Sequence, residues 1–317
     1  MIRTVTLNTG FDETYIVSDV EFGGVSDVLQ YHSEASGKGI NASRTIRRLG
    51  EDVRAYALIG QPDRELFSKA LLGDGIAATL ATVNAPTRRN LTLLSQSSIS
   101  PAAHFRAPGF TISVSEALSD LVSRLEDDCS PGDIISLHGS TPDASPPDVW
   151  CLFSAVAKRK KARLAADVYG APLRRLLEDN PLFLCKPNED EIRILPGASN
   201  ANAETATKQA LIYMLDHGVK LPAVTRGPKG IWFVEAGHLL SAAVEIDHAS
   251  VLVGAGDACM AGMVAAMGQT NATFREIVAF GAAAAAAHVE GTPKAEFAKR
   301  TEILLGRAIV SDLGLLR

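Results

Sequence analysis

The chain has 317 residues, of which 46% are hydrophobic and 21% are charged, a balance typical of a globular protein with a sizeable core. Its formal net charge of −5, with no basic tract, argues against a general nucleic-acid-binding protein. Four cysteines without a CxxC pair and seven histidines without an HxxxH pair argue against a disulfide framework and a transition-metal site.

Neither end of this reasoning points to a membrane or a secretory route. Residues Met1–Leu7 lack the long apolar region of a signal peptide, and no uncharged apolar run reaches the roughly 18 residues of a membrane span. The cysteines lie in apolar contexts, which fits a reducing compartment. We therefore expect a soluble, cytoplasmic protein.

Strands and helices alternate along most of the chain. In chain order, apolar periodicity and glycine or proline stops predict a strand at 2–8, a helix from 36 to Gly50, a strand at 53–59, a helix at 63–72, a strand at 78–83, a helix at 115–128, a strand at 133–138, a helix at 147–160, a strand at 162–167, a helix at 171–178, a strand at 182–185, helices at 188–195 and 203–217, a strand at 221–225, a hairpin-like section at 230–246, and helices beginning near 255, 273 and 295. Alternation of this length implies an α/β fold with a mostly parallel sheet and helices on both faces.

Two β-rich patches, at about 12–35 and 88–107, interrupt the alternation. We interpret them as a small separate sheet inserted into a single domain that spans residues 1–317. A sheet of so few strands is marginal alone, and several of its residues would leave an apolar face to be covered: Tyr15, Val17, Val28, Leu29, Leu91 and Leu93. We expect it to pack against the same sheet of a second copy in a homodimer. The alternative is a flap that closes on its own domain in a monomer.

The segment Val253–Gly262 combines a glycine turn with the start of a helix. Gly254 and Gly256 free the backbone to aim consecutive N–H groups into one space, where a helix start favours an anion. Asp257 would stand beside that anion. It could take the proton of a hydroxyl while the amides stabilise a group in transfer. The alternative is that Asp257 is only an N-cap.

A second glycine-rich helix start is Gly37-Lys38-Gly39. It is not a P-loop, because His32 stands where the first Walker A glycine is required and Gly39 where Ser or Thr is required. Lys38 and the following Asn41 indicate a phosphate or hydroxyl site, or else a capped helix with a surface lysine. Arg88, at the start of the second β patch, could fork onto a phosphate or solvate a strand edge.

Two further motifs follow predicted strands, at the carboxyl ends where ligands usually bind. In Lys186–Glu191, the side chains of Asn188 and Glu191 could hold a hydrated Mg²⁺ near phosphates, or form an ordinary helix cap. In Thr225–Gly230, the glycines could let the backbone approach a purine, or form a simple turn.

Together these motifs resemble the PfkB/ribokinase-type carbohydrate kinases along essentially the whole chain, and most of all the 1-phosphofructokinase and tagatose-6-phosphate kinase branch. The segments that carry the resemblance are Thr6–Asp12 (T-L-N-P-x-x-D), Gly37–Asn41 (G-K-G-I-N), Thr87–Asn90 (T-R-x-N), His138–Ser140 (S-G-S), Lys186–Glu191 (K-P-N-x-x-E) and Gly254–Asp257 (G-A-G-D). The last is the most specific, and the ordered set of six is stronger than any one motif.

The resemblance implies a three-layer α/β/α ribokinase-like fold with a β lid, and ATP-dependent phosphoryl transfer to a hydroxyl of a sugar phosphate, with Mg²⁺. It implies that Asp257 is the general base and that the amides of Gly254, Ala255 and Gly256 form the anion hole. The implied acceptor-binding residues are Asp12, Lys38, Gly39, Asn41, Arg88 and Ser140. The implied nucleotide-binding residues are Lys186, Asn188, Glu191, Thr225, Gly227 and Gly230, with Glu191 serving Mg²⁺ through water.

The chain departs from the family pattern at several positions. His138 replaces a serine and is expected to face the sugar pocket, while Arg226 stands where leucine or a similar residue is usual. Val251-Leu252 stand where polar residues help to bind a monovalent cation in several members. Two alternatives stay open: a kinase of an unphosphorylated sugar or polyol, and a non-catalytic sugar or nucleotide sensor, although a sensor needs no base. A Rossmann dehydrogenase is excluded, because no GxGxxG follows the first strand.

Overall fold

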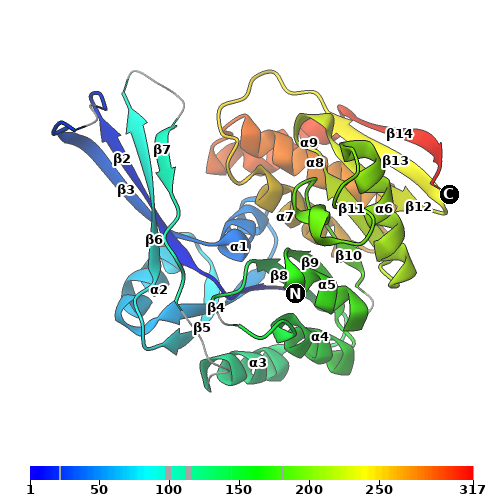
Figure 1. Ribbon diagram of the computed structural model, residues 1–317, viewed down its shortest axis with the longest axis horizontal. Coiled ribbons are helices and arrows are strands. Elements are labelled where there is room, and N and C mark those ends of the chain that lie inside the picture. The colour runs from blue at the N-terminus through cyan, green and yellow to red at the C-terminus, as the bar shows by residue number, and fades with distance from the viewer. Residues whose placement is uncertain (21–22, 97–100, 111–115, 144, 180–181, 317) are drawn as a thin grey trace.

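Ten strands form one central sheet in the computed structural model, which describes residues 1–20, 23–96, 101–110, 116–143, 145–179 and 182–316 (Figure 1). Their order across the sheet is β14 (Ala308–Leu315), β13 (His238–Val244), β12 (Ile231–Glu235), β11 (Leu221–Thr225), β10 (Leu184–Cys185), β9 (Arg163–Val168), β8 (Ile134–Gly139), β1 (Ile2–Thr6), β4 (Val53–Gly60) and β5 (Ala77–Val83). Every pairing from β5 to β11 is parallel, and the pairings from β11 to β14 are antiparallel.

Helices cover both faces of this sheet and give the molecule three layers (Figure 1). One face packs against α3 (Glu116–Asp128), α4 (Val149–Lys160), α5 (Ala171–Asp179) and α6 (Ala203–Asp216). The other packs against α1 (Lys38–Arg48), α2 (Arg64–Gly73), α7 (Ala255–Met267) and α8 (Phe274–Val289), and α9 (Phe297–Leu305) packs on α8. Because α7 lies between the sheet, α1 and α8, it is buried on all sides. The predicted α/β fold with a mostly parallel sheet is confirmed.

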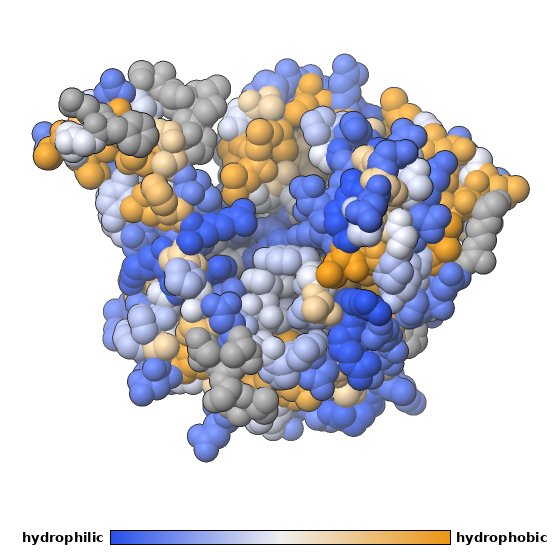
Figure 2. Space-filling model, viewed as in Figure 1, coloured by the Kyte–Doolittle hydropathy of each residue, from blue (hydrophilic) through white to orange (hydrophobic). Residues whose placement is uncertain are grey.

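Four strands form a second, smaller sheet in the order β3 (Val28–Ser36), β2 (Gly10–Val17), β6 (Arg88–Ser95) and β7 (Pro101–Phe105). It projects from the main body beside α1 and α2 (Figure 1), and the surface is hollowed between the two (Figure 2). Arg89 ties its base to the main domain, because its guanidinium lies 2.8 Å from both Glu13 on β2 and Asp63 before α2. Residues 21–22 and 97–100 of the predicted β patches lie outside the described residues, as does residue 115 of the predicted helix 115–128.

The apolar residues of the smaller sheet are only partly covered. Val28, Leu29 and Tyr31 on β3 are each about half exposed, at 50%, 49% and 49%. Val17 is buried instead, and Tyr15 stacks at a ring distance of 5.0 Å on Tyr31. The apolar surface that remains uncovered therefore lies mainly on the edge strand β3.

Two predicted elements differ from the structure. Residues 188–195 do not form an α-helix but a short 3₁₀ helix, Glu191–Ile194, because Leu195 is extended before Pro196, as residues preceding proline usually are. The strand β14 at the sheet edge was not predicted at all. None of the helices formed by the described residues has the length and apolar character that a membrane-spanning helix needs.

Candidate active site

Four side chains lie in a row across the carboxyl ends of adjacent parallel strands. The register of the sheet places Thr6 beside His138, and His138 beside Asp167. Lys186 continues the row after β10, where its N–H donates to Ala166 O at 2.9 Å. Because alternate residues of a strand share a face, these side chains lie on the face covered by α1 and α7. The candidate site is therefore where the N-termini of these two helices meet the sheet.

The glycine turn predicted from the sequence does begin α7. Gly254 is its N-cap, with a left-handed φ of 91° that favours glycine, and no side chain caps this end. The N–H groups of the first turn, from Ala255 to Asp257, therefore have no acceptor within the helix. The N-cap alternative for Asp257 is wrong, because this residue lies inside the first turn. Its Oδ2 instead accepts a hydrogen bond from Asn41 Nδ2 at 2.9 Å.

The Asp257 carboxyl is almost completely buried, and this burial raises its pKa to about 7. The negative charge of Asp167 adds to the rise, while the hydrogen bond from Asn41 and the charges of Lys38 and Lys186 oppose it without overcoming it. A carboxylate with a pKa near neutrality holds a proton much more readily than an ordinary aspartate. That is the property a general base requires at neutral pH.

The two lysines of the site are joined by Asp167, a buried residue that the motifs did not single out. Its Oδ1 lies 3.4 Å from Lys38 Nζ and its Oδ2 lies 3.4 Å from Lys186 Nζ. Lys38 Nζ also lies 2.7 Å from Glu191 Oε1. Burial alone would lower the pKa of both lysines, but the neighbouring carboxylates outweigh it and raise them, so both ammonium groups stay charged. The available sequence signal was a carboxylate at the end of a predicted parallel strand.

Lys186 also reaches the N-terminus of α7. Its Nζ lies 4.0 Å from the position that a Cβ on Gly256 would occupy. The ammonium group and the first-turn amides therefore converge on one space beside Asp257. Together they suit the oxygens of a phosphoryl group, which are stabilised both by a cation and by free helix N–H groups.

The loop Lys186–Glu191 is fixed from two sides. Asn188 Oδ1 accepts from the backbone N–H groups of Asp190 and Glu191, both at 2.9 Å, and Glu191 Oε2 accepts from Asn188 N at 3.0 Å. This is the capping arrangement that the sequence left open, yet the other carboxylate oxygen of Glu191 is used by Lys38. The backbone of Thr225 holds the same loop, since Thr225 N donates to Pro187 O at 3.1 Å.

The next loop, Thr225–Gly230, is brought against it by a buried arginine. Arg226 Nε lies 2.7 Å from Glu189 Oε1, and its guanidinium stacks 3.8 Å from the ring centroid of Trp232. Gly230, with a φ of 83°, is required by packing, because a Cβ would overlap Ala242 O. A Cβ on Gly227 would meet nothing within 4 Å, so open space lies beside that end of the loop.

The predicted acceptor residues gather where the smaller sheet joins the main domain. Asp12 accepts from Asn90 Nδ2 at 2.7 Å and from the Ser36 hydroxyl. Ser140 Oγ accepts from Asn8 Nδ2 at 2.9 Å. A Cβ on the adjacent Gly139 would lie 3.5 Å from Lys38 Cβ, which links this group to the lysine cluster.

Arg88 is partly committed to the backbone in this region. Its guanidinium donates to the carbonyl oxygens of Asn8 at 2.9 Å and Thr9 at 3.2 Å. Burial lowers its pKa, and the charge of Arg106 acts in the same direction, against Tyr169 and Asp12. Arg106, at the exposed end of β7, is thus a second cation near Arg88 that the sequence motifs did not identify.

Comparison with known proteins agrees with this arrangement. The sequence pattern of the pfkB family carbohydrate kinases matches residues 6–295. The 1-phosphofructokinase of Xanthomonas campestris pv. campestris is 30% identical over 269 residues, which cover 83% of each chain. The chain belongs to the pfkB family of carbohydrate kinases.

Other pfkB-type proteins agree in sequence and in fold. The 1-phosphofructokinase of Bacillus subtilis is 28% identical over 300 residues, 92% of this chain and 95% of that one. Phosphofructokinase-2 from Escherichia coli in complex with fructose-6-phosphate superposes with a TM-score of 0.85 at 22% identity, over 96% of this chain and 98% of that chain. Its tetrameric inhibited form superposes with a TM-score of 0.86 at 23% identity and the same coverage. At these identities the structures show the shared ribokinase-like fold.

One residue of this carbohydrate kinase lies differently from the expectation. His138 does not face an open sugar pocket but is fully buried beneath the N-terminus of α1, and its two ring nitrogens have no hydrogen-bond partner among the described residues. Burial lowers its pKa to about 4, so the imidazole is neutral. Gly39 closes the site above it, because a Cβ at that position would overlap Thr6 Oγ1. The glycine of this kinase motif is therefore needed for close packing of α1 on the sheet.

The described residues contain no cluster of three or more His, Cys, Asp or Glu side chains that would cage a metal ion. The nearest oxygen ligands, on Glu191 and Asp167, are already neutralised by Lys38 and Lys186. Mg²⁺ keeps several waters and is usually held by one or two carboxylates and substrate phosphates. The site of this pfkB kinase therefore fits a hydrated Mg²⁺ carried by a nucleotide, which Glu191 would contact through water.

Proposed function

We propose that this pfkB kinase transfers the γ-phosphoryl group of ATP to a hydroxyl of a sugar phosphate, with fructose 1-phosphate as the first candidate acceptor. One observation carries the proposal. The buried Asp257, with a pKa of about 7, lies in the first turn of α7 beside the free N–H groups and close to Lys186. A base and a cationic anion hole in one dry space are what phosphoryl transfer requires.

In the proposed reaction, Asp257 accepts the proton of the acceptor hydroxyl as its oxygen attacks the γ-phosphorus, and ADP leaves. Asn41 keeps the carboxylate aimed through its 2.9 Å hydrogen bond. The amides of Gly254, Ala255 and Gly256, together with Lys186, stabilise the phosphoryl oxygens, because these donors are fixed before the reaction begins.

The remaining predicted residues divide between the two substrates. Asp12, Lys38, Gly39, Arg88 and Ser140 are assigned to the acceptor, with Arg106 as an additional cation for its phosphate. Asn188, Glu191, Thr225, Gly227 and Gly230 are assigned to the nucleotide and its Mg²⁺. The charged Lys38, which bridges Asp167 and Glu191, lies at the boundary between these groups.

A sugar phosphate is favoured over an unphosphorylated sugar by the cations near the smaller sheet. Arg88 and Arg106 lie close enough for one charge to lower the pKa of the other guanidinium. Two like charges in one place are costly unless an anion joins them. The names of the relatives from Xanthomonas and Bacillus point to fructose 1-phosphate, so tagatose 6-phosphate is kept as a comparison substrate.

We further propose that residues 1–317 act as one domain with the smaller sheet as a lid over the acceptor. The half-exposed Val28, Leu29 and Tyr31 on β3 support a homodimer through this lid, because paired apolar edges would cover each other. The four free cysteines support a cytoplasmic location.

The deciding experiment measures ATP-dependent product formation with Mg²⁺ on fructose 1-phosphate, fructose 6-phosphate, tagatose 6-phosphate, fructose and tagatose. The expected result is turnover of a phosphorylated sugar with kcat/KM well above that of the matching free sugar. Preference for a free sugar would establish the plain-sugar alternative. Tight binding of sugar and ATP with no turnover on any acceptor would establish a sensor.

A further inference from the structure

The segment 245–254, which delivers the anion hole to the site, has no helix or strand of its own. It connects β13 to α7, and it exposes Leu252 and Val253 to solvent, at 74% and 79%. An irregular segment with exposed apolar side chains gains little from burial and is expected to open locally. Yet the amides that follow it must be fixed to within a fraction of an ångström to act on a phosphoryl group. Some other contact must hold this segment.

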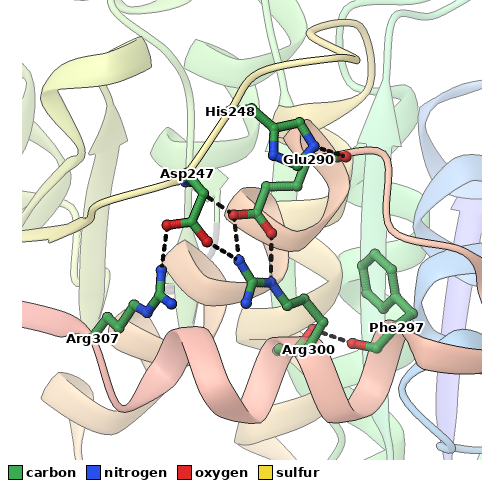
Figure 3. Close-up of polar contacts among 7 residues, drawn as sticks. Asp247, His248, Glu290, Phe297, Arg300 and Arg307 are labelled. Carbon is green, nitrogen blue, oxygen red and sulfur yellow. Dashed lines mark hydrogen bonds and ion pairs between the residues drawn. The ribbon is translucent and has the colours of Figure 1, made fainter.

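A cluster of charged side chains supplies that contact (Figure 3). Arg300 on α9 forks onto the carboxylate of Glu290, with Nε–Oε2 at 2.6 Å and Nη2–Oε1 at 2.7 Å. The same Nη2 lies 2.8 Å from Asp247 Oδ2, in the irregular segment. Arg307 lies on the other side of Asp247, with Nη1–Oδ1 at 3.0 Å. We call these four residues the clamp: Asp247, Glu290, Arg300 and Arg307.

The clamp continues as backbone contacts along the segment. The ring of His248 lies 3.1 Å from Glu290 O, and the N–H groups of Ser250 and Val251 donate to Val289 O at 2.8 and 3.0 Å. Val253 O lies 2.7 Å from the Nε2 atom of His288. The segment is thus attached to the C-terminal end of α8 from residue 247 up to the residue before Gly254.

The members of the clamp differ in burial, and this difference identifies the important pair. The Glu290 side chain is only 3% exposed, and that of Arg300 is 23% exposed. A buried carboxylate that loses its cation is strongly destabilised. Asp247 and Arg307 are 59% and 41% exposed, and ion pairs of that kind contribute little. Arg300 is therefore the residue on which the cluster depends.

We propose that Arg300 is a positioning residue for phosphoryl transfer. Through Glu290 and Asp247 it holds the segment 245–254 against α8, and so fixes the amides of Gly254–Gly256 relative to Asp257. The proposal rests on the proposed kinase function for its effect on catalysis. The order of the segment, in contrast, can be measured without any substrate.

The test compares Arg300→Ala with two controls. Arg307→Ala removes the exposed side of the clamp, and Arg275→Ala removes an exposed pair with Glu235, 2.8 Å apart, which does not touch the segment. In Arg300→Ala we expect kcat to fall by about 10- to 100-fold, the scale of a misplaced anion hole, while KM for the acceptor changes little. Both controls are expected to keep kcat within about fivefold, because exposed pairs contribute at most about a factor of five.

Two further readouts separate positioning from general damage. Amide hydrogen exchange at Ser250 and Val251 is expected to accelerate in Arg300→Ala, with no change in α3 on the opposite face of the sheet. Millimolar guanidinium ion is expected to restore part of kcat by filling the space left by the side chain. If Arg300→Ala does not fold, Arg300→Lys replaces it, since lysine keeps the charge but loses the fork.

An active wild-type protein whose Arg300→Ala variant keeps its kcat would overturn the proposal. Unchanged exchange at Ser250 and Val251 would overturn it as well. A wild-type protein without kinase activity would instead refute the proposed function. Even then, the exchange measurement would decide whether Arg300 orders the segment.

Discussion

The amide nitrogen of Asn41 lies 2.9 Å from a carboxylate oxygen of Asp257, although 216 positions separate the two residues in the chain. This contact joins the first turns of α1 and α7, the two helices that begin in the glycine motifs. It orients the carboxylate while leaving its other oxygen free of the amide. The two motifs are therefore parts of one site, and the properties of Asp257 give the first tests.

The substitution Asp257→Asn is expected to lower kcat by about 10²–10⁴, the range for loss of a general base. Nucleotide affinity should stay near normal, because the asparagine keeps the shape of the side chain and the first-turn amides remain. Steady-state kinetics and ATP binding by calorimetry measure the two quantities. The exposed Asp120, paired with Arg124 on α3, provides the control Asp120→Asn, which should behave as wild type. Normal turnover in the Asp257 variant would rule out this residue as the base.

The raised pKa of Asp257 also predicts a pH profile. A base must be deprotonated, so kcat/KM is expected to fall about tenfold per pH unit below a pKa near 7, and to level off above it. The profile is measured with the acceptor well below KM, with pH-independence of the coupling assay as a control. A flat profile between pH 5.5 and 8 would contradict the assignment.

The same shift has a consequence for stability. A carboxyl whose pKa is raised in the folded protein favours folding at pH values below its unfolded pKa, and this contribution is lost as the pH rises through about 7. Asp257→Asn removes the buried charge and should therefore be more stable than wild type at pH 8, by a few kcal/mol at most. Near pH 4 the two proteins should unfold at similar denaturant concentrations. Equal stability at both pH values would show that the carboxylate is not buried in solution.

On the acceptor side, Arg88→Ala is expected to lower kcat/KM for the sugar phosphate by roughly 10- to 150-fold, mostly through KM, because a charge-assisted hydrogen bond contributes about 1.5–3 kcal/mol. Arg106→Ala should act in the same direction with less effect on folding, because Arg106 is exposed whereas Arg88 also holds the Asn8 and Thr9 carbonyls. The matching unphosphorylated sugar is the control substrate, whose weak turnover should not change in Arg106→Ala. Equal losses on both substrates would mean that these arginines do not bind the phosphate.

The Arg226–Glu189 pair, at 2.7 Å, connects the two proposed nucleotide loops. Arg226→Leu, which introduces the residue type usual in the family, is expected to raise KM for ATP about 5- to 50-fold, because Glu189 loses its partner and the loops separate. Glu189→Gln should have a smaller effect, and the double variant should lose less than the sum of the two. Arg159→Leu, which breaks an exposed pair with Glu126, serves as control. Additive effects would show that the pair does not act as a unit.

The assembly is tested by sedimentation. A lid-to-lid homodimer predicts a mass of twice 33.5 kDa at micromolar concentration. Leu29→Arg, at a half-exposed position of β3, should shift the protein to monomer without unfolding it, because charges on an edge strand oppose pairing. A wild-type mass of 33.5 kDa would leave the monomeric flap as the arrangement.

Much of this protein was determined locally and could be predicted from the sequence alone. Glycine at positions 254 and 256 is compatible with few backbone arrangements, so the helix start, its free amides and the place of Asp257 followed from the residues themselves. The alternation of strands and helices likewise follows from apolar periodicity, and it led directly to a mostly parallel sheet.

Contacts between distant segments were decided only by the tertiary structure. Asp167 lies in an ordinary apolar strand, and nothing in its neighbours distinguishes it; the register of β8, β9 and β10 is what brings it between Lys38 and Lys186. The same holds for β14, which forms by pairing with β13, and for His138, which α1 covers completely. Burial and charge at a point depend on every segment that packs there, so the near-neutral pKa of Asp257 is a property of the fold and not of its motif.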